Sequence, residues 1–335
     1  MKKIILYLIV LFCLIFLLPL IFTKKKKEIK NDVITETNTT QTVETKNKKI
    51  YNIKLYHTKT NEIEEISLDE YLYGVVAGEI PAEYNIEALK AQAVSARTYT
   101  IYQIINSKGK HEDADICDNY ACCQAWISKD DRLERWEEEK KEEYWNKITE
   151  AVDSTSEQII TYDGKPIDAF FHSNSGGITE TAANVWGGNN FPYLKVVETV
   201  GESDYSEYSS EVQISKQELV KLVKNKYNEF NINWNEENQI QVTEYTESGR
   251  VRTLKIGNIN ISGTEARSIF GLKSTKFSIE SNGNIIKFNV LGYGHGVGMS
   301  QTGADSLAKQ GYNYKEILKH FYSDVEILTI WDVSF

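Results

Sequence analysis

Apolar and polar positions divide the chain into three parts. Residues 4–22 form an almost unbroken apolar run of 19 residues, with two lysines before it and four lysines at 24–27 after it. As a helix this run would extend about 28 Å, which is enough to cross the hydrocarbon core of a bilayer. Because no small-x-small cleavage site follows, residues 1–23 are expected to be an uncleaved transmembrane anchor. Residues 24–49 are polar, threonine-rich and aperiodic, which predicts a disordered tether.

From residue 50 onwards the pattern becomes that of a folded domain. Alternating apolar and polar residues at 50–57 predict a half-buried strand. Ser67 and Glu70 have the spacing of a capping box and begin a short helix, which Pro81 ends. A stronger helix is predicted from Ile86 to about Asn106, where apolar residues recur every three to four positions and many alanines permit close packing.

The remaining elements mix helices and strands without a regular order. Further helices are predicted at 131–156, at 216–227, from 263 and at 314–322, and strands at 158–162, 240–245 and 251–256. Because strands and helices do not alternate as in a parallel βαβ array, the fold class is predicted to be α+β. Residues 50–335 are expected to form one domain with a substrate groove, and 207–285 is a candidate inserted lobe that would make it bilobal.

The charge of the chain limits its partners. The net charge is −10, and beyond residue 30 the chain carries 31 basic and 47 acidic residues. An acidic body repels polyanions, which argues against nucleic-acid binding. Lysines lie on both sides of the apolar run, so charge does not decide which side of a membrane the domain would occupy.

Three cysteines outside the apolar run lie close together in the sequence. Cys117, Cys122 and Cys123 are an odd number, so they cannot all form intrachain disulfides. With His111 they give the spacing H-x5-C-x4-C-C, whose four soft ligands are suited to a closed tetrahedral zinc site with a structural role. The alternative is a disulfide from Cys117 to Cys122 or Cys123 that leaves one free thiol.

Glycine occupies every second position at the start of GYGHGVGMSQTGA, residues 292–304. The spacing is not the G-x-G-x-x-G of dinucleotide-binding loops, and no phosphate-binding Lys-Ser/Thr end is present. By itself the segment indicates a tightly packed turn around His295.

Four ordered motifs together resemble the stage II sporulation protein D family. They are GEIPAEYNIEALKAQAVSARTY at 78–99, CCQAW at 122–126, FFHSNSGG at 170–177 and GYGHGVGMSQTGA at 292–304. The resemblance implies a membrane-anchored lytic transglycosylase that cleaves peptide-free peptidoglycan glycan strands during forespore engulfment, between the mother-cell and forespore membranes. It also implies partnership with stage II sporulation proteins P and M. Relatives include a non-catalytic enhancer of cell-wall amidases, so a glycan-binding accessory role is the alternative. Cys122 stands where the family often has histidine.

A lytic transglycosylase needs one acid, because the C6 hydroxyl of muramic acid attacks its own anomeric carbon and replaces water. Glu79 occupies the family-matching position and is the predicted acid. It would lie where the first helix ends, and the negative end of the helix dipole together with Ile80 and Pro81 would favour its protonated form. The alternative is a solvated residue at a helix end. Glu83 and Glu87 are rivals that are expected to be first-turn helix charges.

Other motif residues are predicted to line the groove. Lys90 and Arg97 are candidates to meet a muramic lactyl carboxylate, with ordinary exposed helix charges as the alternative. Ser173, Ser175 and the glycines at 176–177 would present hydroxyls and amides to sugars. The remaining candidate contacts are Tyr293, His295, Ser300 and Gln301. A serine hydrolase with Ser175 and His295 is disfavoured because no G-x-S-x-G elbow is present.

Overall fold

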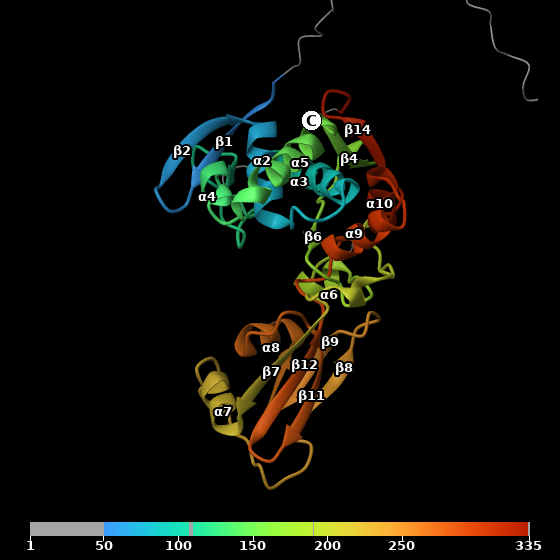
Figure 1. Cartoon of the computed structure of the whole chain (residues 1–335). Coiled ribbons are helices and arrows are strands. Elements are labelled where there is room, and N and C mark those ends of the chain that lie inside the picture. The colour runs from blue at the N-terminus through green and yellow to red at the C-terminus, as the bar shows by residue number, and fades with distance from the viewer. Residues whose placement is uncertain (1–49, 107–109, 190, 334–335) are drawn as a thin grey trace, which may run out of the picture. The chain divides into compact units, whose positions relative to one another are not determined.

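A computed structural model describes residues 50–106, 110–189 and 191–333, which belong to one compact unit that begins at Ile50. The predicted anchor and tether, residues 1–49, lie outside the described residues. Within the described residues, no helix has both the length and the apolar character needed to span a membrane. The unit mixes helices with several small sheets, so the predicted α+β class is confirmed (Figure 1).

The first sheet supports the helix that ends at Glu79. Strands β1 (Asn52–His57) and β2 (Glu62–Ser67) pair antiparallel, and β3 (Ile116–Cys117) pairs parallel with β1. Helix α2 (Leu68–Glu79) follows directly because Ser67 and Glu70 form the predicted capping box. Its apolar residues are buried in the first core cluster, which fixes the direction in which the helix ends.

Helix α3 (Ile86–Asn106) is the central element of the upper part in Figure 1. It packs against α2, α5 (Lys141–Asp153), β4 (Gln158–Tyr162), α9 (Gln301–Lys309) and α10 (Tyr314–Phe321). Residues 88, 89 and 91–101 are all buried, so the helix is covered on every side along this stretch. Small side chains make this possible because they let neighbouring backbones approach closely.

The predicted helix over 131–156 is not continuous. Ser128 caps a five-residue helix, α4 (Lys129–Leu133), and a 3-10 turn at Glu138–Lys140 precedes α5. Trp136 lies in the break and packs edge-on against Tyr144 with ring centroids 5.4 Å apart. The periodic apolar positions are therefore divided between this break, which holds Trp136, and α5, which holds Tyr144.

The second core cluster joins the end of the chain to its middle. Strand β14 (Glu326–Thr329) pairs with β4, which also pairs with β5 (Lys165–Pro166). Strand β6 (Phe171–His172) pairs parallel with β13 (Met299–Ser300), and so places the motif at 170–177 beside the glycine-rich motif.

Residues 209–291 form a lobe with its own core cluster. Strand β7 (Ser209–Ser215) leads into α7 (Lys216–Lys224), and β8 (Ile240–Tyr245), β9 (Val251–Ile256) and β10 (Ile259–Ser262) form one sheet. Helix α8 (Gly263–Phe270) follows, and β11 (Lys276–Asn282) and β12 (Ile285–Leu291) pair in a second sheet with β7. Buried residues such as Leu254, Phe277 and Phe288 join the two sheets and both helices in one cluster.

Close backbone contacts require glycine in the turn at 292–298. Gly298 has φ +71°, and a Cβ at this position would lie 2.0 Å from the carbonyl oxygen of Phe170. The same carbonyl accepts a hydrogen bond of 3.0 Å from the Met299 N–H. Only glycine lets β13 approach β6 this closely.

We predict that Gly298→Ala destabilises the protein far more than Gly188→Ala. Gly188 also has positive φ, +77°, but a Cβ there would meet nothing within 4 Å. Gly188→Ala is expected to cost about 1–2 kcal/mol for the backbone conformation alone, and Gly298→Ala a further ~2 kcal/mol or more for the clash. Urea unfolding of the two full-length variants measures the difference, and equal losses would contradict this account.

Candidate functional site

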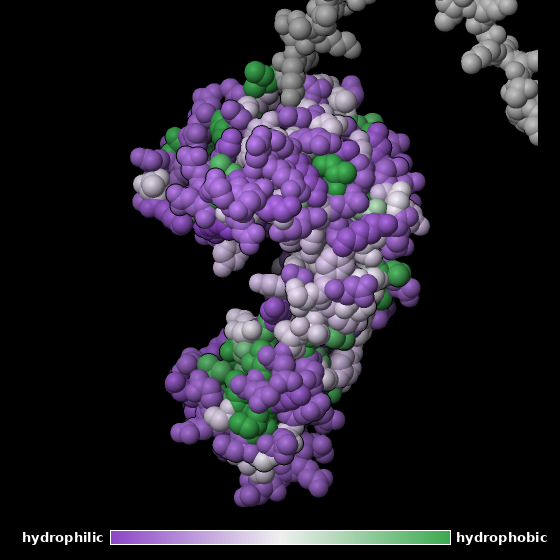
Figure 2. All heavy atoms as spheres, viewed as in Figure 1, coloured by the Kyte–Doolittle hydropathy of each residue, from purple (hydrophilic) through white to green (hydrophobic). Residues whose placement is uncertain are grey.

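A cleft of about 890 Å³ lies between the 209–291 lobe, which contributes Arg267, and the rest of the folded unit, whose residues form most of the lining. Figure 2 shows the surface hollowed in this region. Five of the residues predicted as the acid or as sugar contacts line the cleft, namely Glu79, Ser173, Tyr293, His295 and Gln301. All four sequence motifs therefore contribute residues to this cleft, and the 122–126 motif contributes Cys122 and Cys123.

Glu79 is the last residue of α2 and its carboxyl group is partly buried at the cleft wall. Burial raises its pKa to about 7, and this effect outweighs the hydrogen bond from the Ala125 N–H, which lowers it. That N–H donates to Oε1 at 2.6 Å. The bond leaves the other carboxyl oxygen to carry a proton, so the group is poised to act as an acid near neutrality.

Two glycines on α2 allow the segment at 124–127 to reach Glu79. A Cβ on Gly78 would lie 3.3 Å from the Ala125 backbone, and one on Gly74 would lie 2.3 Å from Nε1 of Trp126. The Ile127 N–H also donates to the Gly74 carbonyl at 3.3 Å. Gly78 therefore precedes the acid for a steric reason: it makes room for the backbone that binds Glu79.

The Cys-His cluster lies in the same loop. The nearest ligand atoms of His111, Cys117, Cys122 and Cys123 all lie within 4.8 Å of one another. His111 Nε2 is 3.3 Å from the Cys123 sulfur and 3.7 Å from the Cys122 sulfur, and the two sulfurs are 4.0 Å apart. Tetrahedral zinc requires N–S and S–S separations of about 3.5–3.8 Å, and the separations among His111, Cys122 and Cys123 are close to these values. All three cysteines are free thiols in the structure.

His172 and His295 are both neutral in this environment. Burial lowers the pKa of His172 to about 3 and holds that of His295 well below its usual value. His295 Nδ1 accepts a 3.1 Å hydrogen bond from the Val297 N–H, and His172 Nδ1 donates to the Val297 carbonyl at 3.1 Å. The two rings therefore organise the glycine-rich turn. Within the described residues, His172 Nε2 has no hydrogen-bond partner.

An exposed aromatic ring at the cleft was not predicted from the sequence. Trp186 ends α6 (Ala182–Trp186) and is 52% exposed. Its ring centroid lies 4.6 Å from that of Phe170 and 5.0 Å from that of His295. A flat apolar ring held at a cleft wall is suited to stacking against a sugar face. The only sequence signal is a tryptophan before two glycines, and it says nothing about exposure.

Ser175 and Ser300 are fully buried and do not reach the cleft, which corrects their prediction as sugar contacts. Both hydroxyls donate to the carboxylate of Glu202, which is 1% exposed. The other donors to this carboxylate are the N–H groups of Ser175 (3.0 Å) and Gly177 (2.8 Å) and the hydroxyls of Thr199 (2.7 Å) and Thr302 (3.1 Å). Hydroxyls that a sequence reading assigns to the substrate are used to bind a buried carboxylate.

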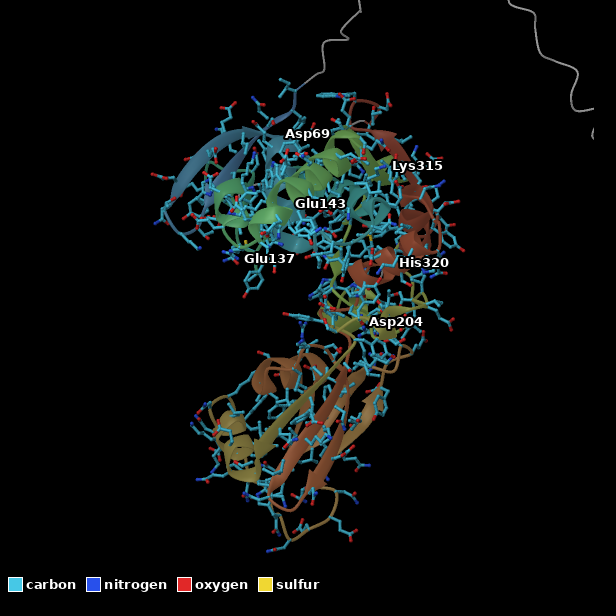
Figure 3. All side chains as sticks on the ribbon, in the orientation of Figure 1. Asp69, Glu137, Glu143, Asp204, Lys315 and His320 are labelled. Atoms are coloured by element: carbon cyan, nitrogen blue, oxygen red, sulfur yellow. The ribbon has the colours of Figure 1, made fainter. Side chains whose placement is uncertain are left out.

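Arg97 and Lys90 are also absent from the cleft lining. Arg97 is 0% exposed, and its guanidinium donates to the carbonyls of Thr155 (2.8 Å), Val152 (3.2 Å) and Gln158 (3.3 Å) and to Asp69 (3.3 Å). It thus caps the carboxyl end of α5, where the helix dipole favours a cation. Asp69 is labelled in Figure 3. Lys90 forms an ion pair of 2.8 Å with Glu87. The expected carboxylate contact is therefore wrong for Arg97, because the surrounding elements leave it no exposed surface.

The 209–291 lobe contributes residues that the sequence reading missed. Arg267 of α8 lines the cleft, as does Glu207, which directly precedes the lobe. Burial lowers the pKa of the Arg267 guanidinium. Arginine side chains are charged at neutral pH, so the residue brings a cation to the cleft. The periodicity that predicts α8 does not say which of its charged residues faces another part of the chain.

Comparisons with known proteins agree with the motifs. Residues 56–162 match the stage II sporulation protein family, and residues 198–298 match a domain of unknown function. Stage II sporulation protein D of Bacillus amyloliquefaciens is 34% identical over 277 residues, which is 82% of this chain and 78% of that protein. The protein of the same name from Bacillus subtilis (strain 168) is 34% identical over 276 residues, with the same coverage.

A more distant relative carries a different name. The amidase enhancer of Bacillus subtilis (strain 168) is 26% identical over 300 residues, which is 75% of this chain and 39% of that protein. The sporulation proteins have the higher identity, and the match covers 82% of this chain and 78% of each of them. With the four motifs gathered around one cleft, the chain belongs to the stage II sporulation protein D family.

Proposed function

We propose that this protein is a lytic transglycosylase that cleaves the bond between N-acetylmuramic acid and N-acetylglucosamine in peptidoglycan glycan strands. The observation that carries the proposal is Glu79, a carboxyl group at the wall of a large cleft whose pKa burial raises to about 7. An acid that is half protonated at neutral pH can both give and take a proton during one reaction cycle.

The reaction needs only this one group. Glu79 gives its proton to the glycosidic oxygen as the bond to the muramic anomeric carbon breaks. The C6 hydroxyl of the same muramic residue then bonds to that carbon, and the Glu79 carboxylate takes the hydroxyl proton. The products are a free hydroxyl on the leaving sugar and a 1,6-anhydro end, no water is consumed, and Glu79 is protonated again.

A second carboxylate in the cleft gives a rival mechanism. Glu207 also lines the cleft, and a hydrolase would use two carboxylates, one as acid and one to activate water or attack the sugar. Hydrolysis leaves a reducing end, whereas transglycosylation leaves an anhydro end. The product therefore distinguishes the two mechanisms.

We further propose that the Cys-His cluster holds one structural zinc ion. Four ligands would close the coordination shell, so the ion would bind no substrate water. Its role would be to fix the loop from Cys117 to Ala125, whose last N–H binds Glu79.

Anchoring and partnership are proposed from family membership. The globular part would be held by residues 1–23 on the outer side of the mother-cell membrane, facing the forespore membrane. Stage II sporulation proteins P and M would be its partners, and enzymatic removal of stem peptides would supply its peptide-free substrate.

The second candidate function is a glycan-binding enhancer of a cell-wall amidase. The similarity to the amidase enhancer of Bacillus subtilis favours it. In that case the cleft would bind glycan without cutting it, and the raised pKa of Glu79 would have no consequence for turnover.

We predict that Glu79→Gln lowers release of anhydro-ended products by at least about 10³-fold, because the amide cannot donate a proton to the leaving oxygen. Mass spectrometry of products from peptide-free glycan, with full-length chain in mild detergent, measures this. Glu207→Gln is the matched control and should still give anhydro ends. Reducing ends that require Glu207 would instead indicate hydrolysis, and no cleavage by the unaltered chain would favour the enhancer role.

We predict that kcat/KM is constant at acidic pH and falls about tenfold per pH unit above about pH 7, because Glu79 must begin protonated. The sign follows from burial, which raises the pKa and so keeps the acid form up to neutrality. Initial rates of anhydro-product formation between about pH 5 and 9 test this. Rates that keep rising through pH 8 would rule out Glu79 as the initial acid.

We predict one zinc ion per chain, and loss of that ion in Cys117→Ser together with a fall of at least about 5 °C in Tm. Metal analysis after purification under reducing conditions and a thermal melt provide the measurements. Cys13→Ser, which changes the cysteine outside the cluster, should keep both zinc and Tm. A metal-free unaltered chain with full stability would contradict the assignment.

A further inference from the structure

A second hollow continues the cleft on the side of the 209–291 lobe. Its volume is about 430 Å³, and its lining shares Arg267 and Tyr293 with the main cleft. Lys273 lines this second hollow, and its Nζ lies 5.0 Å from the centre of the Tyr293 ring. Two cations therefore flank the point where the two hollows meet.

Local structure brings both cations to this place. Helix α8 ends at Gly271, whose φ of +64° reverses the chain, and the Leu272 N–H then donates to the Arg267 carbonyl at 2.9 Å. The next carbonyl, that of Lys273, accepts a 2.9 Å hydrogen bond from Gly294 in the glycine-rich turn. The lobe is thus fixed to the same turn that carries Tyr293 and His295.

Arg267 keeps most of its donors available for a ligand. Its Nε donates to the Leu272 carbonyl at 3.3 Å, and in the described part of the chain neither terminal nitrogen forms a hydrogen bond. The two terminal nitrogens therefore form an open fork of the kind that binds a carboxylate through two parallel hydrogen bonds. By contrast, Arg97 and Arg250 are buried and donate to backbone carbonyls.

Arg267 and Lys273 are positively charged residues in a protein that is mostly acidic. The body beyond residue 30 has 47 acidic and 31 basic residues, and Glu207 lines the main cleft. Among the described residues that line the two hollows, the arginine and lysine side chains are those of Arg267 and Lys273. An anionic group on a bound strand would be repelled by Glu207 and attracted to the side of the lobe.

We propose that Arg267, with Lys273 and Tyr293, forms a subsite for the lactyl carboxylate of N-acetylmuramic acid on peptide-free glycan. The proposal rests on the function proposed above. In a strand that carries stem peptides this carboxyl group is an uncharged amide, so the subsite distinguishes peptide-free from peptide-bearing strands. The function of the 198–298 region would then be to form the side of the cleft that binds peptide-free strands in preference to peptide-bearing strands.

The test measures binding, so that it does not depend on cleavage. Full-length chain with Glu79→Gln in mild detergent is titrated into three kinds of end-labelled glycan strand, and fluorescence anisotropy gives Kd. The strands are peptide-free strands with free lactyl carboxylates, the same strands with these groups converted to neutral methylamides, and strands that carry intact stem peptides.

We expect the free-carboxylate strands to bind about tenfold more tightly than the methylamide strands, and we expect Arg267→Gln to remove this difference. Arg267→Lys should keep part of the difference, because it retains charge without the fork. Lys273→Gln should reduce the difference in Kd between the two kinds of strand about threefold. Lys224→Gln, at an exposed site on α7 of the same lobe, is the charge control and should keep it in full.

A difference between acid and neutral strands that persists in Arg267→Gln overturns the proposal. If that variant does not fold, Arg267→Lys and Lys273→Gln must still reduce the difference in Kd. If both variants retain the full difference, the proposal is overturned. Binding of peptide-bearing strands that depends equally on Arg267 would assign the subsite to peptide carboxylates instead. If the unaltered chain produces no anhydro ends but the Arg267 effect is present, the transglycosylase proposal fails and the subsite stands.

Discussion

The geometry of the cleft depends on a buried carboxylate that does not line it. Glu202 is 1% exposed and accepts hydrogen bonds from four hydroxyls and two backbone N–H groups of segments that are far apart in the sequence. These donors lie in the 170–177 motif, at Thr199, and at the start of α9 in the glycine-rich motif. A buried carboxylate costs much free energy unless its oxygens are hydrogen bonded, so the three segments are constrained to converge on it. Because only a short segment separates Glu202 from the start of β7 at Ser209, the same contact helps to fix where the 209–291 lobe begins.

A second constraint, independent of the first, holds the acid. Glu79 is positioned by the end of α2 and by the Ala125 N–H, and the loop that supplies this N–H is held by Gln124 and by the Cys-His cluster. The buried Gln124 amide donates to Thr100 at 3.0 Å and to Tyr71 at 3.3 Å, which joins the loop to α3 and α2. The acid and the glycine-rich turn are therefore supported by different parts of the core, and a change in one support should leave the other in place.

Local signals in the sequence predict the elements but not the surfaces. Capping boxes and 3.6-residue periodicity locate α2 and α3 because these features act within a single helix. The same periodicity suggests a continuous helix over 131–156, since it does not register that Trp136 and Tyr144 pack across a break. Arg97 and Ser175 were predicted to contact substrate from residue type and motif, yet their burial is set by distant partners, which lie 28 or more positions from Arg97 and 24 or more positions from Ser175. The same limit explains why Trp186 and Arg267 were missed, because their place at the cleft depends on packing between segments that are far apart in the sequence.

An acid and a cation in one cleft could weaken each other, since a nearby positive charge lowers a carboxyl pKa. The raised pKa of Glu79 has burial as its main cause and the Ala125 N–H as the opposing one, so the charge of Arg267 does not set it. The two groups belong to different lobes and different supports, so the acid would stay protonated near neutrality while the cation attracted an anionic strand. A muramic residue carries both a C6 hydroxyl and a lactyl carboxylate, and in the proposed reaction the separation of the two protein groups along one cleft would let the protein act on both.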